Sequence, residues 1–102
     1  MSLPFADQAI VSQAKLVEYL LNPAHPRGRG KAQFFLSLGF RREQPDLLRQ
    51  ALLRLAATAE MTETSGMFGR KFVGAGELDT PGGRTVRVLT VWMLADGVPP
   101  PQ

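Results

Sequence analysis

Apolar residues recur at helical spacing in the first half of the chain. Leu16 and Leu20 lie four positions apart, in a segment that follows Ser12, a suitable N-cap residue. This spacing predicts a helix from Ser12 to about Leu21. The Asn-Pro pair that comes next ends the helix, because the residue before a proline disfavours helical dihedral angles. Residues 5–11 are predicted to lead into this helix as an irregular segment or a short strand.

Two further helices are predicted before residue 60. One runs from about Lys31 to Gly39, a residue that suits the position after a helix end. We expect this helix to be mostly buried, because it carries Phe34, Phe35, Leu36 and Leu38. The other covers residues 45–59. It begins with a proline that fits the first helical position and an aspartate that complements the positive end of the helix dipole.

After residue 59 the period of the pattern changes to two. Residues 70–78 and 84–94 are predicted to be antiparallel strands joined by residues 79–83, with Pro81-Gly82 at the centre of a type II turn. Residues 61–67 are a candidate third strand. Both faces of residues 84–94 are apolar, which predicts a central strand covered on both sides. One face holds Val86, Val88, Thr90, Trp92 and Leu94, and the other holds Leu89, Val91 and Met93.

Helices followed by a small antiparallel sheet define an α+β fold, with the N-terminal helices packed on the sheet. The 102 residues are enough for one hydrophobic core. We therefore expect a single domain over residues 1–98. Residues 99–102 form a Pro-rich tail that cannot pair as a central strand.

Composition narrows the classes of function. No apolar run approaches the ~18 residues that span a bilayer, and residues 1–7 lack the features of a signal peptide. A cytoplasmic protein without membrane contact is therefore expected. The sequence has no cysteine and one histidine, so neither a metal site nor a cofactor is expected. The Gly-Arg-Gly-Lys run at residues 28–31 lacks the spacing of a phosphate-binding P-loop.

Positive charge is concentrated around a Pro/Gly-rich loop. The net charge is +3, and residues 22–42 hold five cations and no carboxylate. His25, the one histidine, lies in this loop between two prolines. A histidine in an unbalanced basic segment is typical of a site that binds or cleaves phosphodiesters. The alternative is a solvated surface loop.

A long pattern in the sequence resembles a known bacterial family. The pattern is Lys15-Leu-x-x-Tyr-Leu-Leu-Asn-Pro-x-His-Pro-x-Gly-x-Gly-Lys31-Ala-x-Phe-Phe-x-x-Leu-Gly-Phe40, then Gly69-x-Lys71, Gly76-x-Leu-Asp-Thr-Pro-Gly-Gly-Arg84 and Thr90-Val-Trp92. It resembles DUF6883, a small domain family, over roughly residues 9–98. Related domains look like toxin modules at the C-termini of polymorphic toxins.

The resemblance implies a fold similar to the ribonuclease toxins that include barnase, EndoU, colicins and RelE. It also implies RNA as the substrate and a cognate antitoxin or immunity protein as a partner. Members of the family usually continue with one more short strand after the region that matches residues 99–101. A chain that ends at Gln102 is expected to lack that strand, which favours an inactive relative.

His25 is the natural candidate for a general acid or base, because imidazole exchanges protons near neutral pH. Metal-independent RNA cleavage needs a base for the 2′-hydroxyl, an acid for the leaving oxygen and cations that stabilise the phosphorane. Lys31 and Arg29 are candidates for the cationic role, and Arg27 for contact with the RNA backbone. The alternative for His25 is a loop residue that only hydrogen-bonds nearby backbone.

Lys31 is predicted near a helix N-terminus, where free N–H groups favour an anion; a solvated side chain is the alternative. Lys15 is expected at the rim of the first helix, within reach of the sheet. Tyr19 is interpreted as a packing residue. The hydroxyl of Thr90 is predicted to hold the scissile phosphate beside Lys71. The alternative is that this hydroxyl only forms a hydrogen bond to the neighbouring strand.

Trp92 is a candidate for stacking on a base, with burial in the core as the alternative. Arg84, near the predicted turn, is a candidate contact for RNA backbone or an ordinary solvated charge. The candidate catalytic residues are therefore His25, Lys31, Lys71 and Thr90. The candidate substrate-binding residues are Lys15, Arg27, Arg29, Arg84 and Trp92.

The sequence thus predicts a metal-independent endoribonuclease of the toxin type, within a toxin–antitoxin pair. The alternative is a non-catalytic module that binds a protein or a nucleic acid. Convergence of the four candidate catalytic residues on one phosphate position would favour the enzyme, and a His25 far from Thr90 would favour the alternative. A homodimer through an incomplete sheet edge is a further expectation.

Overall fold

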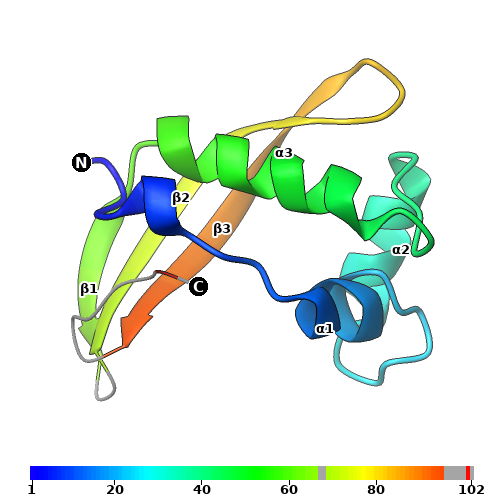
Figure 1. Ribbon diagram of the computed structural model, residues 1–102, viewed down its shortest axis with the longest axis horizontal. Helices are drawn as coiled ribbons and strands as arrows, with labels where there is room; N and C mark the ends of the chain where they lie inside the picture. Colours follow the sequence, from blue (N-terminus) through cyan, green and yellow to red (C-terminus); the bar gives the residue numbers. More distant parts are fainter. Residues whose placement is uncertain (67–68, 96–100, 102) are drawn as a thin grey trace.

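Three antiparallel strands form one sheet in the order β1-β2-β3 (Figure 1). The computed structural model describes residues 1–66, 69–95 and 101. Strand β1 is Thr62–Gly66, β2 is Gly69–Asp79 and β3 is Thr85–Ala95. The predicted hairpin and the candidate third strand are confirmed, although Met67 lies outside the described residues. With the helices first in sequence, the predicted α+β class is confirmed.

The turn between β2 and β3 differs from the predicted type. Gly83, and not Gly82, has a positive φ, at 87°. The amide of Gly83 donates to the carbonyl of Thr80 at 3.0 Å, and the amide of Thr80 donates to the carbonyl of Arg84 at 3.0 Å. A type II turn would need positive φ at Gly82, so that prediction is wrong. The second glycine takes the left-handed position, as in hairpins that end a tight turn with a one-residue bulge.

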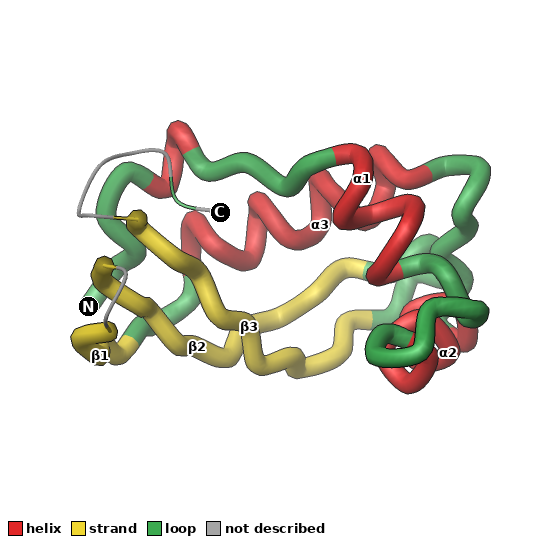
Figure 2. The backbone as a smooth tube through the Cα atoms, turned by 90° about the horizontal axis from the view of Figure 1, so that it is seen from below, coloured by secondary structure: helices red, strands yellow, loops and turns green. Residues whose placement is uncertain are grey.

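Helix α3, Pro45–Thr58, lies across one face of the sheet (Figures 1 and 2). It begins and ends close to where the sequence predicts. Leu48 and Leu55 on the helix are fully buried, as are Phe72, Leu78 and Leu94 on the strands. The core of the domain is therefore the layer between α3 and the sheet.

Strand β3 lies at the edge of the sheet, which corrects the prediction of a central, two-sided strand. Its neighbour in the order is β2, and no described segment pairs with its other edge. Figure 2 shows no described helix on the sheet face opposite α3. On that face Leu89 is 67% exposed and Val91 is 50% exposed. The apolar pattern of these residues is thus not explained by burial in this fold.

The N-terminal segment has less regular structure than predicted. Residues 5–11 contain no strand; they hold a 3₁₀ turn, η1, at Ala6–Gln8. The next helix begins as α1, Gln13–Lys15, and widens into a π-helical turn, η2, at Leu16–Leu20. Ser12 is its N-cap as predicted, and its Oγ accepts a hydrogen bond from the amide of Lys15 at 3.1 Å.

Helix α2, Arg29–Ser37, lies at the end of the sheet near η2 (Figure 1). It starts two residues before the predicted position and is followed by Gly39 at φ 99°. Only Ala32 and Phe35 are buried in it, while Phe34 remains 43% exposed. The prediction of a mostly buried helix is therefore wrong, because one side of α2 faces an open groove.

The Pro-rich tail predicted at residues 99–102 lies outside the described residues except for Pro101. That residue is buried, and its carbonyl accepts a hydrogen bond from the amide of Ile10 at 3.0 Å. Within the described ranges, none of the helices has the length and apolar character needed to cross a membrane.

Candidate nucleic-acid interface

A groove of about 610 Å³ runs between the edge of β3 and the elements α1, η2 and α2. Residues from both faces of β3 line it, so it follows the edge of the strand with which no described segment pairs. Phe34, Leu89 and Val91 contribute apolar surface. Its polar lining consists of Ser12, Lys15, Tyr19, Lys31, Lys71 and Thr90. We call this site the basic groove.

Every lysine in the sequence lines the basic groove. The chain has three lysines and nine arginines. Lys15 comes from α1, Lys31 from α2 and Lys71 from β2, and no arginine is among the lining residues. These three elements are far apart in sequence, so the fold itself gathers the lysines.

The positive charge of the groove has no acidic counterpart among the described residues. No aspartate or glutamate lines it. The ion pairs in the described ranges join carboxylates to arginines or to the N-terminal amino group, and none includes a lysine. An anion entering the groove would therefore meet uncompensated ammonium groups.

The carboxylates are instead held at other positions on the molecule. The guanidinium of Arg70 donates two hydrogen bonds to Glu63, at 2.7 and 2.9 Å, which lowers the pKa of that carboxyl group. The N-terminal amino group of Met1 donates to Glu60 at 2.7 Å and lowers its pKa. Both carboxylates thus remain ionised to lower pH than usual, yet neither lines the basic groove.

Lys31 and Tyr19 form a direct polar pair between α2 and η2 in the groove. The Nζ of Lys31 donates to the hydroxyl oxygen of Tyr19 at 3.1 Å. Lys31 is the third residue of α2, and its side chain is exposed, whereas Tyr19 is half-buried. The pair therefore presents a phenol and an amine together at the wall of the groove.

The loop that carries His25 packs against Tyr19. Nδ1 of His25 accepts hydrogen bonds from the amides of Arg27 and Gly28, each at 3.1 Å. The imidazole meets the Tyr19 ring edge-on, with 4.9 Å between the ring centroids and an angle of 80°. A Cβ at Gly28 would lie 2.8 Å from the carbonyl oxygen of Tyr19, so only glycine allows this close approach.

His25 does not line the basic groove. With Nδ1 accepting from the backbone, a neutral imidazole carries its proton on Nε2. His25 therefore acts in this structure as a hydrogen-bond acceptor that closes the loop, which was the alternative to its catalytic role. Lys31, Lys71 and Thr90 all line the groove.

Thr90 and Trp92 are bound to one another inside the sheet. The indole Nε1 of Trp92 donates to Oγ1 of Thr90 at 3.0 Å, and that hydroxyl donates to the carbonyl of Gly74 at 3.1 Å. The hydroxyl proton of Thr90 is therefore already donated to the backbone of β2. Trp92 is only 4% exposed, so it forms part of the groove floor and leaves little ring surface for a base.

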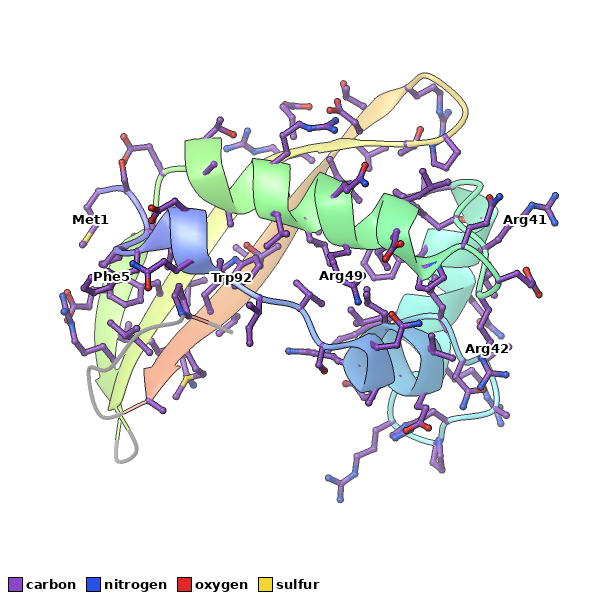
Figure 3. The ribbon with its side chains drawn as sticks, viewed as in Figure 1. Met1, Phe5, Arg41, Arg42, Arg49 and Trp92 are labelled. Carbon is purple, nitrogen blue, oxygen red and sulfur yellow. The ribbon has the colours of Figure 1, made fainter. Side chains whose placement is uncertain are left out.

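The other predicted substrate contacts lie outside the basic groove. Arg27 and Arg29 are exposed around the start of α2, and Arg84 is exposed beside the hairpin turn. Arg41 and Arg42 lie at the end of the molecule away from Trp92 (Figure 3). Of the five cations in residues 22–42, only Lys31 lines the groove.

Two groove residues were missed or misjudged from the sequence. Tyr19 was interpreted as packing, although Lys15 and Tyr19 are four positions apart and this spacing places them on one face of a helix. Phe34 was expected in the core and is instead exposed in the groove. The described residues contain no cluster of three or more His, Cys, Asp or Glu side chains that could hold a metal ion.

These features define a small α+β domain with a lysine-lined groove along the β3 edge of the sheet. The chain belongs to the DUF6883 family, a domain of unknown function, whose profile matches residues 2–102. No curated protein and no solved structure shows significant similarity to the chain.

Proposed function

We propose that this domain is a metal-independent endoribonuclease of the toxin type that binds RNA in the basic groove. The observation that carries the proposal is the convergence of Lys15, Lys31 and Lys71 on one groove without an acidic residue in its lining. A phosphodiester chain is the anionic ligand that such a set of point charges suits.

Lysine also suits a reaction better than arginine does. The guanidinium of arginine stays protonated, whereas an amine can give up and take back a proton. Most positive charges of this chain are arginines, yet all the cations that line this groove are lysines. This selective use of lysine supports proton transfer in addition to binding.

The Tyr19–Lys31 pair takes the proton-transfer role. Removal of the 2′-hydroxyl proton lets the 2′-oxygen form a bond to phosphorus, and the bond from phosphorus to the 5′-oxygen breaks as that oxygen gains a proton. The products are a 2′,3′-cyclic phosphate and a 5′-hydroxyl, with no net change in protons. Lys15 and Lys71 stabilise the charge that develops on the phosphorane oxygens.

His25 has a positioning role in this mechanism. It packs on the ring of Tyr19 at a centroid distance of 4.9 Å and closes the loop that also brings Gly28 against that ring. A toxin of this kind acts on cellular RNA and is inhibited by a cognate antitoxin or immunity protein. The groove is the surface that such a partner would cover.

Two observations favour a second candidate, a non-catalytic module that binds RNA or a protein. His25 lies outside the lining of the groove, and the hydroxyl proton of Thr90 is already donated to a carbonyl. Two of the four residues predicted to act on the phosphate are thus occupied by structural contacts. This candidate shares the groove with the enzyme and differs from it only in the absence of cleavage.

The test is incubation of the purified protein with mixed single-stranded RNA in the presence of EDTA. Wild-type protein is expected to cleave, and Lys31→Gln to lose most cleavage, because proton-transfer groups contribute ~10²–10⁴-fold. Arg41→Gln is the matched control, since it removes one positive charge at an exposed position outside the groove. Binding without cleavage by folded wild-type protein would establish the non-catalytic module instead.

A further inference from the structure

The basic groove contains an exposed aromatic ring. Phe34 on α2 lines the groove and is 43% exposed, whereas its neighbour Phe35 is only 6% exposed. The two rings meet edge to face, with centroids 5.4 Å apart. Phe35 in the core thus holds Phe34 in place from one side, and the remaining ring surface of Phe34 is open to the groove.

Across the groove, β3 also presents apolar side chains to solvent. Leu89 and Val91 line the groove and are 67% and 50% exposed. Apolar groups left in water reduce stability relative to polar ones at the same place, so a cluster of them in a groove indicates a ligand. This ligand must carry anionic groups for the lysines and flat apolar groups for the ring.

We propose that the basic groove takes single-stranded nucleic acid, with one unpaired base stacked on Phe34 and the adjoining phosphate at Lys31. This inference rests on the proposed function and adds to it the strandedness of the substrate and the residue that holds the base. Leu89 and Val91 contact the base from the opposite wall.

The spacing on α2 supports this assignment. Lys31 and Phe34 are three residues apart, so their Cβ atoms lie about 5–6 Å apart on one face of the helix. The helix therefore places an ammonium beside an aromatic ring, as a nucleotide places its phosphate beside its base. In a duplex the bases are paired and stacked on each other, and their faces are closed to Phe34.

An acidic amphipathic peptide is the other ligand with anionic and apolar groups. Nucleic acid is favoured by the open face of Phe34, because every base offers a π-face of matching shape and base–aromatic stacking tolerates any sequence. The two ligands make different demands on Phe34. A peptide needs only apolar surface, which leucine supplies, whereas a base needs an aromatic ring.

The experiment measures the affinity of fluorescein-labelled decamers by anisotropy. Their riboses are 2′-O-methylated, so that they cannot be cleaved. Wild type, Phe34→Leu and Phe34→Trp are compared on an oligouridylate, on an abasic chain of the same length and on a duplex. Phe5→Leu is the matched control, because Phe5 is also 43% exposed but does not line the groove. Thermal unfolding by circular dichroism establishes that each variant is folded.

Phe34→Leu is expected to weaken binding of the oligouridylate by about 5- to 150-fold, the range that follows from loss of one stacked base. Phe34→Trp should bind the oligouridylate with an affinity close to that of wild type, and Phe5→Leu should leave the wild-type affinity unchanged. The abasic chain should bind wild type and Phe34→Leu equally, and the duplex should bind more weakly than the single strand.

Equal affinity of wild type for duplex and single strand would overturn the inference. So would an equal loss by Phe34→Leu on the abasic chain, or tighter binding of an acidic leucine-containing decapeptide than of the oligouridylate. If RNA cleavage depends on Lys31 while Phe34→Leu changes neither binding nor cleavage, the inference fails and the proposed function stands. If folded wild type binds none of the oligonucleotides, both fail.

Discussion

The amine of Lys31 lies 3.1 Å from the hydroxyl oxygen of Tyr19, and this contact joins α2 to η2 at the wall of the groove. The two residues are twelve positions apart, on either side of the loop that contains His25. The two residues of the proposed proton-transfer pair therefore flank the loop that holds the histidine.

Removal of the Tyr19 hydroxyl should abolish most cleavage without unfolding the domain. Tyr19→Phe keeps the ring against His25 and Gly28 but leaves Lys31 without its partner. We expect kcat/KM on RNA to fall by ~10²–10⁴-fold, as for other proton-transfer groups. The measurement is single-turnover cleavage of a labelled RNA in EDTA, with the thermal midpoint as the control for folding. Full activity of Tyr19→Phe would remove the phenol from the mechanism.

The role of His25 can be separated into chemistry and positioning by two substitutions. An asparagine in a turn accepts hydrogen bonds from amides two residues on, as the imidazole Nδ1 does here, but it cannot transfer protons as imidazole does. His25→Asn should therefore retain most cleavage. His25→Ala loses both acceptor contacts and should lose activity together with ~1–2 kcal/mol of stability. If both variants lose cleavage equally while remaining folded, His25 itself transfers the proton.

Binding of single-stranded RNA should depend on salt through the three lysines. Neutralising Lys15, Lys31 and Lys71 together with glutamine should reduce the slope of log affinity against log salt concentration by about 2, since each phosphate contact on a single strand contributes ~0.7. The control replaces Arg41, Arg54 and Arg87 with glutamine. These arginines are exposed and do not line the groove, so the control removes the same amount of charge at other positions. Titrations at four salt concentrations give both slopes. Equal changes in the two variants would mean that only overall charge matters.

The helix α3 and the hairpin were predictable from the sequence because their signals are local. Pro45 and Asp46 mark a helix start, and the glycines after Pro81 mark a turn. The position of β3 was not predictable in this way. Leu89 and Val91 give β3 the apolar pattern of a central strand. In the fold these side chains line the groove and are not covered by a second layer of described secondary structure. Which strand lies at the edge depends on contacts between distant segments.

The candidate site shows the same division. Lys15, Lys31 and Lys71 were identified from the sequence, and the fold brings them together. The sequence offers the hydrogen bonds of His25 and Thr90 only as alternatives to roles in catalysis. It cannot decide between the two, since the outcome depends on side-chain direction and on which backbone groups lie nearby. The exposure of Phe34 was hidden for a related reason. The run of Phe34, Phe35, Leu36 and Leu38 predicts a mostly buried helix, and only the open groove leaves Phe34 exposed.

Gly74 should be required for the packing of the core. A Cβ there would overlap the carbonyl oxygen of Glu60 and the sulfur of Met61, where the chain leads from α3 into β1. Gly74→Ala should therefore destabilise the protein by ~1–3 kcal/mol, as overpacking does. Gly82→Ala is the control, because its Cβ would meet no atom within 4 Å. Urea unfolding of both variants gives the comparison, and an equal stability would place the Glu60 backbone farther from β2.

Stability should fall in acid partly through the Glu63–Arg70 pair between β1 and β2. Hydrogen bonds from Arg70 lower the pKa of Glu63 below its ordinary value of 4.5. The unfolded chain therefore binds this proton at higher pH than the folded protein does. The stability that the pair contributes is complete above about pH 4.5 and is lost as pH falls through the lowered pKa. Both partners are partly exposed, at 42% for Arg70 and 31% for Glu63, so salt should weaken the effect.

Glu63→Gln should accordingly show a smaller drop in its urea midpoint between pH 6 and pH 3 than wild type. Arg70→Gln should reduce the drop by the same mechanism, because the carboxyl group then keeps its ordinary pKa in both states. The double variant should resemble either single variant, since each substitution removes the same interaction. If the single variants lose stability in acid as steeply as wild type, or if their effects add in full, the two side chains are not coupled in solution.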